Sequence, residues 1–193
     1  MPKQPFEKFN IWFGEALEKQ KNLPETMTLA TVDAEGMPDA RIVLLKEVTP
    51  EGFVFFTNYQ SLKANQLAAN PKAAAVFWWP ILERQVRIRG HVSKISPEQS
   101  DKYSQTRPRG SQIGAWASKQ SQVLENRAEL EQAYQEFDKK YAGQTIPRPD
   151  FWGGYCLKPH YFEFWQGREN RLHERLVYES DSQELWVSKQ LAP

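Results

Sequence analysis

The spacing of apolar residues separates an initial helix from a long run of strands. Apolar residues recur at helical spacing at Phe6, Phe9, Phe13, Ala16 and Leu17, which predicts an amphipathic α-helix. We therefore expect an N-terminal helix within residues 1–25. Short segments rich in β-branched and aromatic residues, bounded by turn-forming residues, predict strands over residues 27–32, 41–46, 53–57, 73–79 and 83–93, and three more between 155 and 187.

The segments between these strands carry signals for three further helices. Ser96 can cap a helix, Pro97 suits its first position, and Gln99 stands where a capping box places Glu or Gln. We predict helices over residues 61–70, 96–106 and 122–141, with a loop over residues 107–111. Antiparallel strands with helices packed against them indicate an α+β fold around a small β-barrel. Because no linker or repeat divides the sequence, we expect one domain over residues 1–193.

Composition and charge narrow the function classes. The formal net charge is +1, which argues against nucleic acid as a partner because nucleic-acid-binding proteins usually carry a basic excess. A single cysteine, Cys156, excludes an internal disulfide and suits a reducing compartment. The sequence shows neither a signal peptide nor an apolar segment long enough to span a membrane. We therefore expect a cytoplasmic protein without a membrane partner.

The common phosphate-binding motifs are missing from the sequence. Gly-x-Gly-x-x-Gly and Gly-x-x-x-x-Gly-Lys-Ser/Thr do not occur. The histidines, His91, His160 and His173, are too widely spaced to suggest a metal site. Any phosphate must therefore be held mainly by arginine, lysine and hydroxyl side chains.

The segment Arg171-Leu172-His173-Glu174-Arg175 is a prominent candidate for anion binding. If it is extended, Arg171, His173 and Arg175 point to the same face of a strand. Such a face is poor core material, because a buried charge is costly unless it is paired. Arginine offers donors that suit a phosphate, and histidine adds a proton switch near neutral pH. The alternative is a solvated strand face beside acidic neighbours.

Several other groups of residues carry donors suited to an anion. The strongest is Arg107-Pro108-Arg109-Gly110-Ser111, which follows Tyr103 at a helix end and places two guanidiniums and a hydroxyl on one segment. Gln85 is a polar residue in a strand of alternating character, for which an exposed or edge position is the alternative. The remaining groups are Arg41 and Lys46 around an apolar strand, Thr57, Ser61 and Lys63 after a strand, and Gln120 and Ser121 before the long helix.

Long motifs in these regions resemble, in order along the chain, those of pyridoxine/pyridoxamine 5′-phosphate oxidases. The resemblance runs from about Met27 to Pro193. The matching segments are Arg41-Ile42-Val43-Leu44-Leu45-Lys46, Leu82-Glu83-Arg84-Gln85-Val86-Arg87, the stretch from Ser111 to Ser121, Phe151-Trp152-Gly153-Gly154, Phe162-Glu163-Phe164-Trp165 and Arg171-Leu172-His173-Glu174-Arg175.

The resemblance implies an FMN-binding split β-barrel that forms a homodimer with FMN at the interface and needs no metal. Arg171 and His173 would lie beside the pyridine ring of the substrate as the catalytic residues, and they are also substrate-binding. The implied contacts of the substrate phosphate are Lys46, Tyr103, Arg107 and Ser111. The implied FMN contacts are Arg41, Ile42, Val43, Leu44, Leu45, Lys46, Phe56, Thr57, Lys63, Gln85, Gln120, Ser121, Trp165 and Arg175.

The resemblance also implies a reaction. The C4′ alcohol or amine of pyridoxine or pyridoxamine 5′-phosphate would be oxidised to the aldehyde, a hydride would pass to the flavin, and O₂ would reoxidise the flavin and give H₂O₂. The cofactor carries the redox chemistry in such enzymes, while the protein orients the reactants. We expect Arg171 to hold the substrate ring and His173 to hydrogen-bond near the ring oxygen or to assist proton movement.

The sequence departs from the family pattern in a few places. Leu62 stands where the family usually has an arginine for the FMN phosphate, and Gln190 stands where arginine is common. We also expect the N-terminal arm that closes over the substrate in family members to be missing. Three alternatives stay open: another split-barrel flavin reductase, a non-catalytic binder of FMN or pyridoxal phosphate, and a nucleic-acid-binding barrel.

Overall fold

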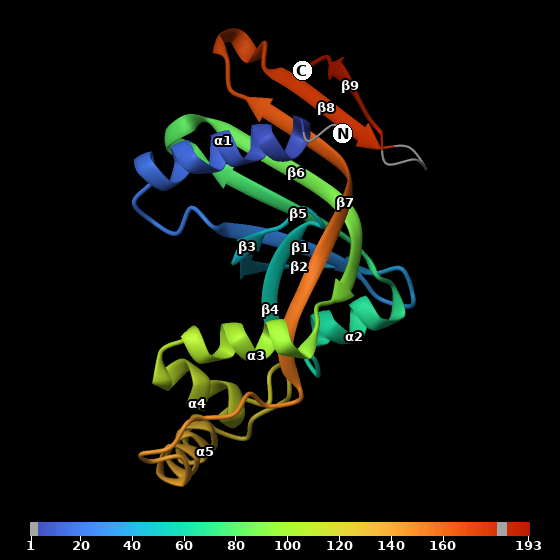
Figure 1. The fold of residues 1–193 in the computed structure, drawn as a ribbon. Helices are drawn as coiled ribbons and strands as arrows, with labels where there is room; N and C mark the ends of the chain where they lie inside the picture. The colour runs from blue at the N-terminus through green and yellow to red at the C-terminus, as the bar shows by residue number, and fades with distance from the viewer. Residues whose placement is uncertain (1–3, 181–184) are drawn as a thin grey trace.

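The computed structural model describes residues 4–180 and 185–193. Within these residues the strands form one curled, antiparallel, nine-stranded sheet in the order β2-β1-β5-β6-β7-β4-β3, with β8 and β9 continuing beyond β7 (Figure 1). The elements are α1 (Gln4–Lys19), β1 (Thr26–Val32), β2 (Pro38–Leu44), β3 (Glu47–Val48), β4 (Phe53–Asn58), α2 (Leu62–Ala69), β5 (Lys72–Trp79), β6 (Arg84–Lys94), α3 (Pro97–Thr106), α4 (Arg109–Ala117), α5 (Arg127–Lys140), β7 (Trp152–Gln166), β8 (Glu174–Ser180) and β9 (Trp186–Leu191).

The main core lies between helix α1 and the inner face of the curled sheet. Phe9 of α1 is fully buried, and its ring centroid lies 4.8 Å from that of Phe53 and 5.1 Å from that of Phe77. Buried positions alternate along β1, as expected for a strand with one face in the core. The apolar spacing therefore predicted helix α1 correctly, with Phe9 and Ala16 fully buried, but Leu17 is 55% exposed. The expected α+β split barrel is confirmed.

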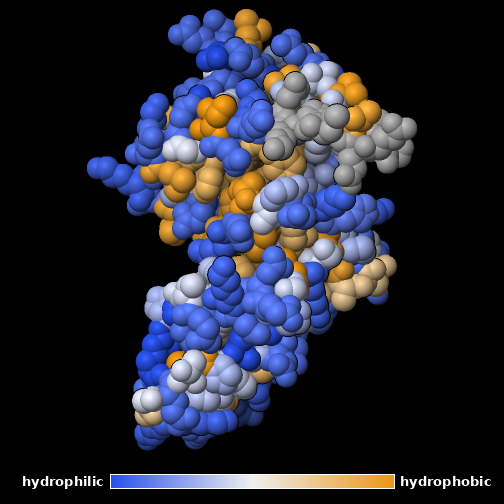
Figure 2. Space-filling view, in the orientation of Figure 1, coloured by the Kyte–Doolittle hydropathy of each residue, from blue (hydrophilic) through white to orange (hydrophobic). Residues whose placement is uncertain are grey.

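The long strand β7 connects this core to the helices α3, α4 and α5 at the other end of the molecule (Figure 1). Gly153 permits the close approach of other groups at this point, because a Cβ there would lie 2.2 Å from the hydroxyl oxygen of Tyr59 and 3.0 Å from that of Ser100. Helices α4 and α5 pack on each other around a second, smaller core of Ile113, Tyr141 and Ile146. Polar residues cover most of the face in Figure 2, with apolar residues gathered near its middle.

The helices expected over residues 96–106 and 122–141 are confirmed, but the start of the second helix and the loop expected over residues 107–111 were wrong. Ser96 and Gln99 form the complete capping box at the start of α3. The helix expected from residue 122 begins at Arg127, because Asn126 caps it by accepting a hydrogen bond from the Glu129 N–H. Residues 109–111 open helix α4 instead of lying in a loop. That helix contains two glycines, which are weak helix formers, and the fully buried Ile113 anchors it.

The extended conformation expected over residues 171–175 was also wrong. Glu169–Arg171 forms a 3₁₀ turn in which Asn170 and Arg171 have φ values of 54° and 62°. Strand β8 then begins at Glu174, so Arg171 and His173 precede the strand that carries Arg175. Asparagine tolerates the left-handed region better than most residues, which fits its place in this turn. Strand β2 also begins earlier than expected, at Pro38.

Within the described part of the chain, no helix is both long and apolar enough to cross a membrane.

Candidate active site

A cavity of about 600 Å³ lies where β2, β4 and α2 meet the segments of α3 and α4. It brings together residues that are far apart in the sequence. The predicted site residues that line it are Ile42, Val43, Leu44, Lys46, Phe56, Thr57, Lys63, Tyr103, Arg107, Ser111 and Gln120. Lining residues without a predicted role include Asn58, Pro108, Gly114, Ala115, Ser118 and Trp152.

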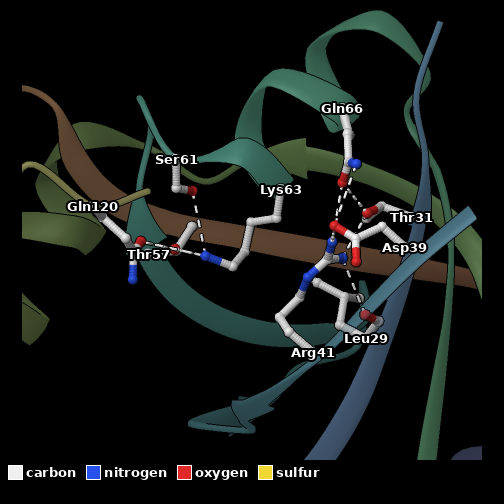
Figure 3. Close-up of polar contacts among 9 residues, drawn as sticks. All are labelled: Leu29, Thr31, Asp39, Arg41, Thr57, Ser61, Lys63, Gln66 and Gln120. Carbon is white, nitrogen blue, oxygen red and sulfur yellow. Dashed lines mark hydrogen bonds and ion pairs between the residues drawn. The ribbon is translucent and has the colours of Figure 1, made fainter. Parts of the chain in front are cut away.

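One part of the cavity wall presents the ammonium group of Lys63. Its Nζ donates to Thr57 Oγ1 at 3.1 Å, to Ser61 Oγ at 3.3 Å and to Gln120 Oε1 at 3.3 Å (Figure 3). The side chain is buried, and no carboxylate pairs with it among the residues that the structure describes. Burial and the nearby charge of Arg41 lower the pKa of Lys63. A buried cation with only neutral partners is suited to an anionic ligand.

Arg41 lies beside Lys63 but is held by its own chain (Figure 3). Its Nη1 donates to Leu29 O and to Thr31 Oγ1, and its Nη2 donates to Asp39 Oδ2 and to Gln66 Oε1. The four terminal N–H groups of this guanidinium are therefore already used. Sequence reasoning missed this network, because its members come from β1, β2 and α2 and share no motif.

A second part of the wall holds the guanidinium of Arg107 on a stack of aromatic rings. The Tyr103 and Phe56 ring centroids lie 3.8 Å apart, and those of Phe56 and Trp152 lie 5.4 Å apart. The guanidinium carbon of Arg107 lies 4.3 Å from the Trp152 ring centroid. Its Nη1 is buried and has no hydrogen-bond partner among the described residues. Burial lowers the pKa of Arg107 and raises that of Tyr103.

A different group of predicted residues lies on β6, β7 and β8 and does not line the cavity. Gln85, Trp165 and Arg175 are direct neighbours in the strand register. The ring of His173 lies 4.5 Å from that of Trp165, between centroids, and Arg171 occupies the preceding turn. Gln85 is in an interior strand, so the alternative of an edge position was wrong.

Three other predicted or candidate residues are not among those that line the cavity. The side chain of Leu45 is buried in the main core, which leaves its backbone for any contact. Ser121 is exposed with φ 71°. Arg109 turns to α5, where its Nη2 pairs with Asp138 Oδ1 at 2.8 Å. Trp152 was missed as a cavity residue, although it belongs to one of the segments that carry the resemblance.

Comparison with known families identifies the chain. Residues 13–141 match the sequence model of pyridoxamine 5′-phosphate oxidase. The chain belongs to the pyridoxamine 5′-phosphate oxidase family. Residues 152–193 match the model of the pyridoxine 5′-phosphate oxidase C-terminal dimerisation region, which supports a homodimer. This second match contains the group on β7 and β8 described above.

Curated members of the pyridoxamine 5′-phosphate oxidase family resemble the chain over nearly its whole length. Pyridoxine/pyridoxamine 5′-phosphate oxidase of Paraburkholderia phymatum is 55% identical over 98% of this chain and 89% of its own. The protein of that name from Gloeothece citriformis is 52% identical over 98% of this chain and 88% of its own. This chain is therefore an oxidoreductase.

Solved structures from this family and its relatives share the fold. PhzG from Burkholderia lata, in complex with tetrahydrophenazine-1-carboxylic acid, superposes with a TM-score of 0.94 at 29% identity, covering 100% of this chain and 94% of that one. A pyridoxamine 5′-phosphate oxidase-related, FMN-binding protein from Nostoc punctiforme has a TM-score of 0.77 at 18% identity, over 100% of this chain and 98% of that one. The latter likeness concerns the fold alone.

Proposed function

We propose that this protein oxidises pyridoxamine or pyridoxine 5′-phosphate to pyridoxal 5′-phosphate with FMN as cofactor and O₂ as acceptor, producing H₂O₂ in vitamin B6 salvage or biosynthesis. The observation that carries the proposal is the pair of cations in one cavity, Lys63 and Arg107, neither of which has a carboxylate partner in the described chain. FMN and a phosphorylated vitamer together bring two phosphates. The names of the curated relatives support this substrate class.

The residues present fit an FMN phosphate at Lys63. The buried ammonium group faces Thr57 and Gln120, whose polar side chains also suit phosphate oxygens. Arg41 adds a fixed positive charge beside them, while its own donors stay with Asp39. In this proposal the strand residues Ile42, Val43, Leu44 and Leu45, together with Phe56 and Ser121, complete the FMN contacts of this subunit.

The Arg107 region fits the phosphate of the substrate. Tyr103 and Ser111 offer hydroxyl donors, and Lys46 adds a third cation to the cavity besides Lys63 and Arg107. The unpartnered Nη1 of Arg107 gains a partner when phosphate binds, which removes the cost of leaving a buried donor unsatisfied.

The second copy in a homodimer supplies the group on β6, β7 and β8. In this proposal Gln85, Trp165 and Arg175 of one copy complete the flavin site of the other. Arg171 orients the substrate ring, and His173 holds or moves a proton at the reacting oxygen or nitrogen. FMN, when bound, would accept the hydride and return the electrons to O₂.

The decisive experiment combines a flavin spectrum with turnover. Purified protein is mixed with FMN and pyridoxamine 5′-phosphate, and oxygen uptake, H₂O₂ and aldehyde are measured. The proposal predicts a bound-flavin spectrum and equal amounts of aldehyde and H₂O₂. A flavin spectrum without turnover would instead indicate a different electron donor or a binding role, and the absence of flavin binding would refute the proposal.

A second candidate substrate comes from the likeness to PhzG, whose solved complex contains a tricyclic carboxylic acid. A carboxylate would also pair with Arg107. The greater identity to the vitamer oxidases favours the phosphorylated substrate. Parallel oxygen-uptake assays with tetrahydrophenazine-1-carboxylic acid distinguish the two, because only the preferred substrate should give a low KM.

A further inference from the structure

Glu163 is a buried carboxylate that the proposed reaction does not use. Its side chain is only 2% exposed, in strand β7 between two fully or nearly fully buried core residues, Phe162 and Phe164. Side chains alternate between the faces of a strand, so Glu163 lies on the opposite face from these phenylalanines. Trp165 lies on the same face as Glu163. A buried carboxylate is costly unless hydrogen bonds and positive charges compensate it.

Three donors from three strands surround this carboxylate. Arg175 Nε on β8 donates to Glu163 Oε1 at 2.8 Å, and Arg87 Nη1 on β6 donates to Oε2 at 2.9 Å. The Tyr161 hydroxyl also donates to Oε2 at 2.8 Å. Burial by itself would raise the pKa of Glu163, but the hydrogen bonds from Arg175 and Tyr161 and the charge of Arg87 lower it. The group of one carboxylate and two guanidiniums keeps a net positive charge.

The contacts of Arg175 leave one edge of its guanidinium available. Besides the bond from Nε to Glu163, its Nη1 donates to Ala192 O at 3.0 Å. Within the described residues, Nη2 has no hydrogen-bond partner. The strand register places Trp165 directly beside Arg175. Both are expected flavin contacts, whereas Glu163 belongs to neither the expected substrate nor the expected cofactor set.

We propose that Glu163 is a positioning residue that fixes the guanidinium of Arg175 for contact with the flavin, an inference that rests on the proposed function. Glu163 holds Nε and the Ala192 carbonyl holds Nη1, which leaves Nη2 available to the cofactor. Preorganised donors bind more tightly because less side-chain freedom is lost on binding.

The test is a double-mutant cycle on FMN affinity, measured by quenching of flavin fluorescence on mixing with apo-protein. Glu163→Gln keeps the shape but removes the charge, and we expect roughly tenfold weaker FMN binding, the loss of one charge-assisted hydrogen bond. Arg175→Ala should weaken binding as well. The double variant should bind no more weakly than Arg175→Ala alone, because Glu163 acts through Arg175.

Glu179→Gln, which breaks an exposed pair with Lys189 on the same sheet, is the matched control and should leave FMN affinity unchanged.

A second variant keeps the test valid if Glu163→Gln does not fold. Arg175→Lys keeps the charge but cannot make both bonds of the planar guanidinium, so its FMN affinity should fall close to that of Arg175→Ala. Additive losses in the cycle, wild-type affinity in Glu163→Gln, or full affinity in Arg175→Lys would each overturn the positioning role. If the wild-type protein binds no FMN, the proposed function fails and this inference fails with it. If it binds FMN normally, those three outcomes concern Glu163 alone.

Discussion

The cations of this chain fall into two classes according to their partners. Arg41, Arg84 and Arg175 each pair with a carboxylate of the same chain. Lys63, which is buried, and Arg107, which is partly buried with its Nη1 fully enclosed, have no carboxylate partner within the described residues. Unpaired buried charge lowers the stability of the protein without ligand, so it is retained where a ligand supplies the missing negative charge.

Replacing Lys63 should separate ligand binding from stability. In Lys63→Met we expect FMN binding to weaken by about 1.5–3 kcal/mol, the scale of a hydrogen bond to a charged group. The apo-protein should keep or gain stability, because an uncompensated buried charge is removed. Fluorescence titration and thermal unfolding measure the two effects. Lys189→Met, at an exposed ion pair, serves as control, and parallel losses of affinity and stability in Lys63→Met would contradict the expectation.

Trp152 should matter for the substrate through its stacking on Arg107. In Trp152→Leu we expect the KM for pyridoxamine 5′-phosphate to rise several-fold, since a desolvated cation–π contact contributes about 1–2 kcal/mol. The kcat should change much less, because Trp152 holds the phosphate end of the site. Steady-state oxygen uptake measures both constants. Trp186→Leu, on β9, is the comparison, and an unchanged KM in Trp152→Leu would exclude this role.

At the scale of elements, helix caps encoded by neighbouring residues could be predicted from the sequence. Elements that depend on contacts between distant segments could not. The capping box of Ser96 and Gln99 is encoded within four residues, and so it could be read directly. Helix α4 has weak local propensity and depends on the burial of Ile113 against α5. The alternation of Arg171, His173 and Arg175 favoured a strand, but a turn at Asn170 and Arg171 delays the start of the strand to Glu174. The cations and hydroxyl groups of the cavity were foreseen from the family resemblance, whereas Trp152 and the network around Arg41 required the fold.

The cap of α3 offers a test of stability without effect on chemistry. Ser96→Ala removes the side-chain acceptor of the Gln99 N–H, which should cost about 1 kcal/mol and lower the Tm by about 2–4 °C. Ser96→Asp, which can still cap the helix, should stay close to wild type. Since Tyr103 and Arg107 lie at the far end of this helix, the KM should not move. Thermal unfolding and oxygen uptake test both statements, and a Tm unchanged by Ser96→Ala would show that the cap is dispensable.

At the scale of the whole molecule, the expected site is divided between two regions of the chain. The cavity residues other than Trp152 belong to the part matched by the oxidase model, whereas Trp165 and Arg175 belong to the dimerisation region. Among the described residues, those that line the cavity do not include the group around Arg175. A homodimer in which each copy completes the site of the other accounts for this division.

Mixing two inactive variants should therefore restore activity. Arg107→Ala damages the cavity, and Arg175→Ala damages the other region. After the two proteins are unfolded and refolded together, half of the dimers pair one variant with the other, and one of their two sites has no substitution. We expect about a quarter of wild-type turnover under random pairing. Each variant refolded alone is the control, and no recovery in the mixture would place the whole site within one chain.

The hydrogen bond from Arg175 to the carbonyl of Ala192 has a practical consequence for protein engineering. Ala192 immediately precedes Pro193. A peptide fused after Pro193 would therefore lie close to the guanidinium that Glu163 also holds. If Arg175 contacts FMN as proposed, a group attached directly after Pro193 would disturb this hydrogen bond and weaken FMN binding. The same group on a flexible spacer, or fused before α1, should leave FMN affinity unchanged.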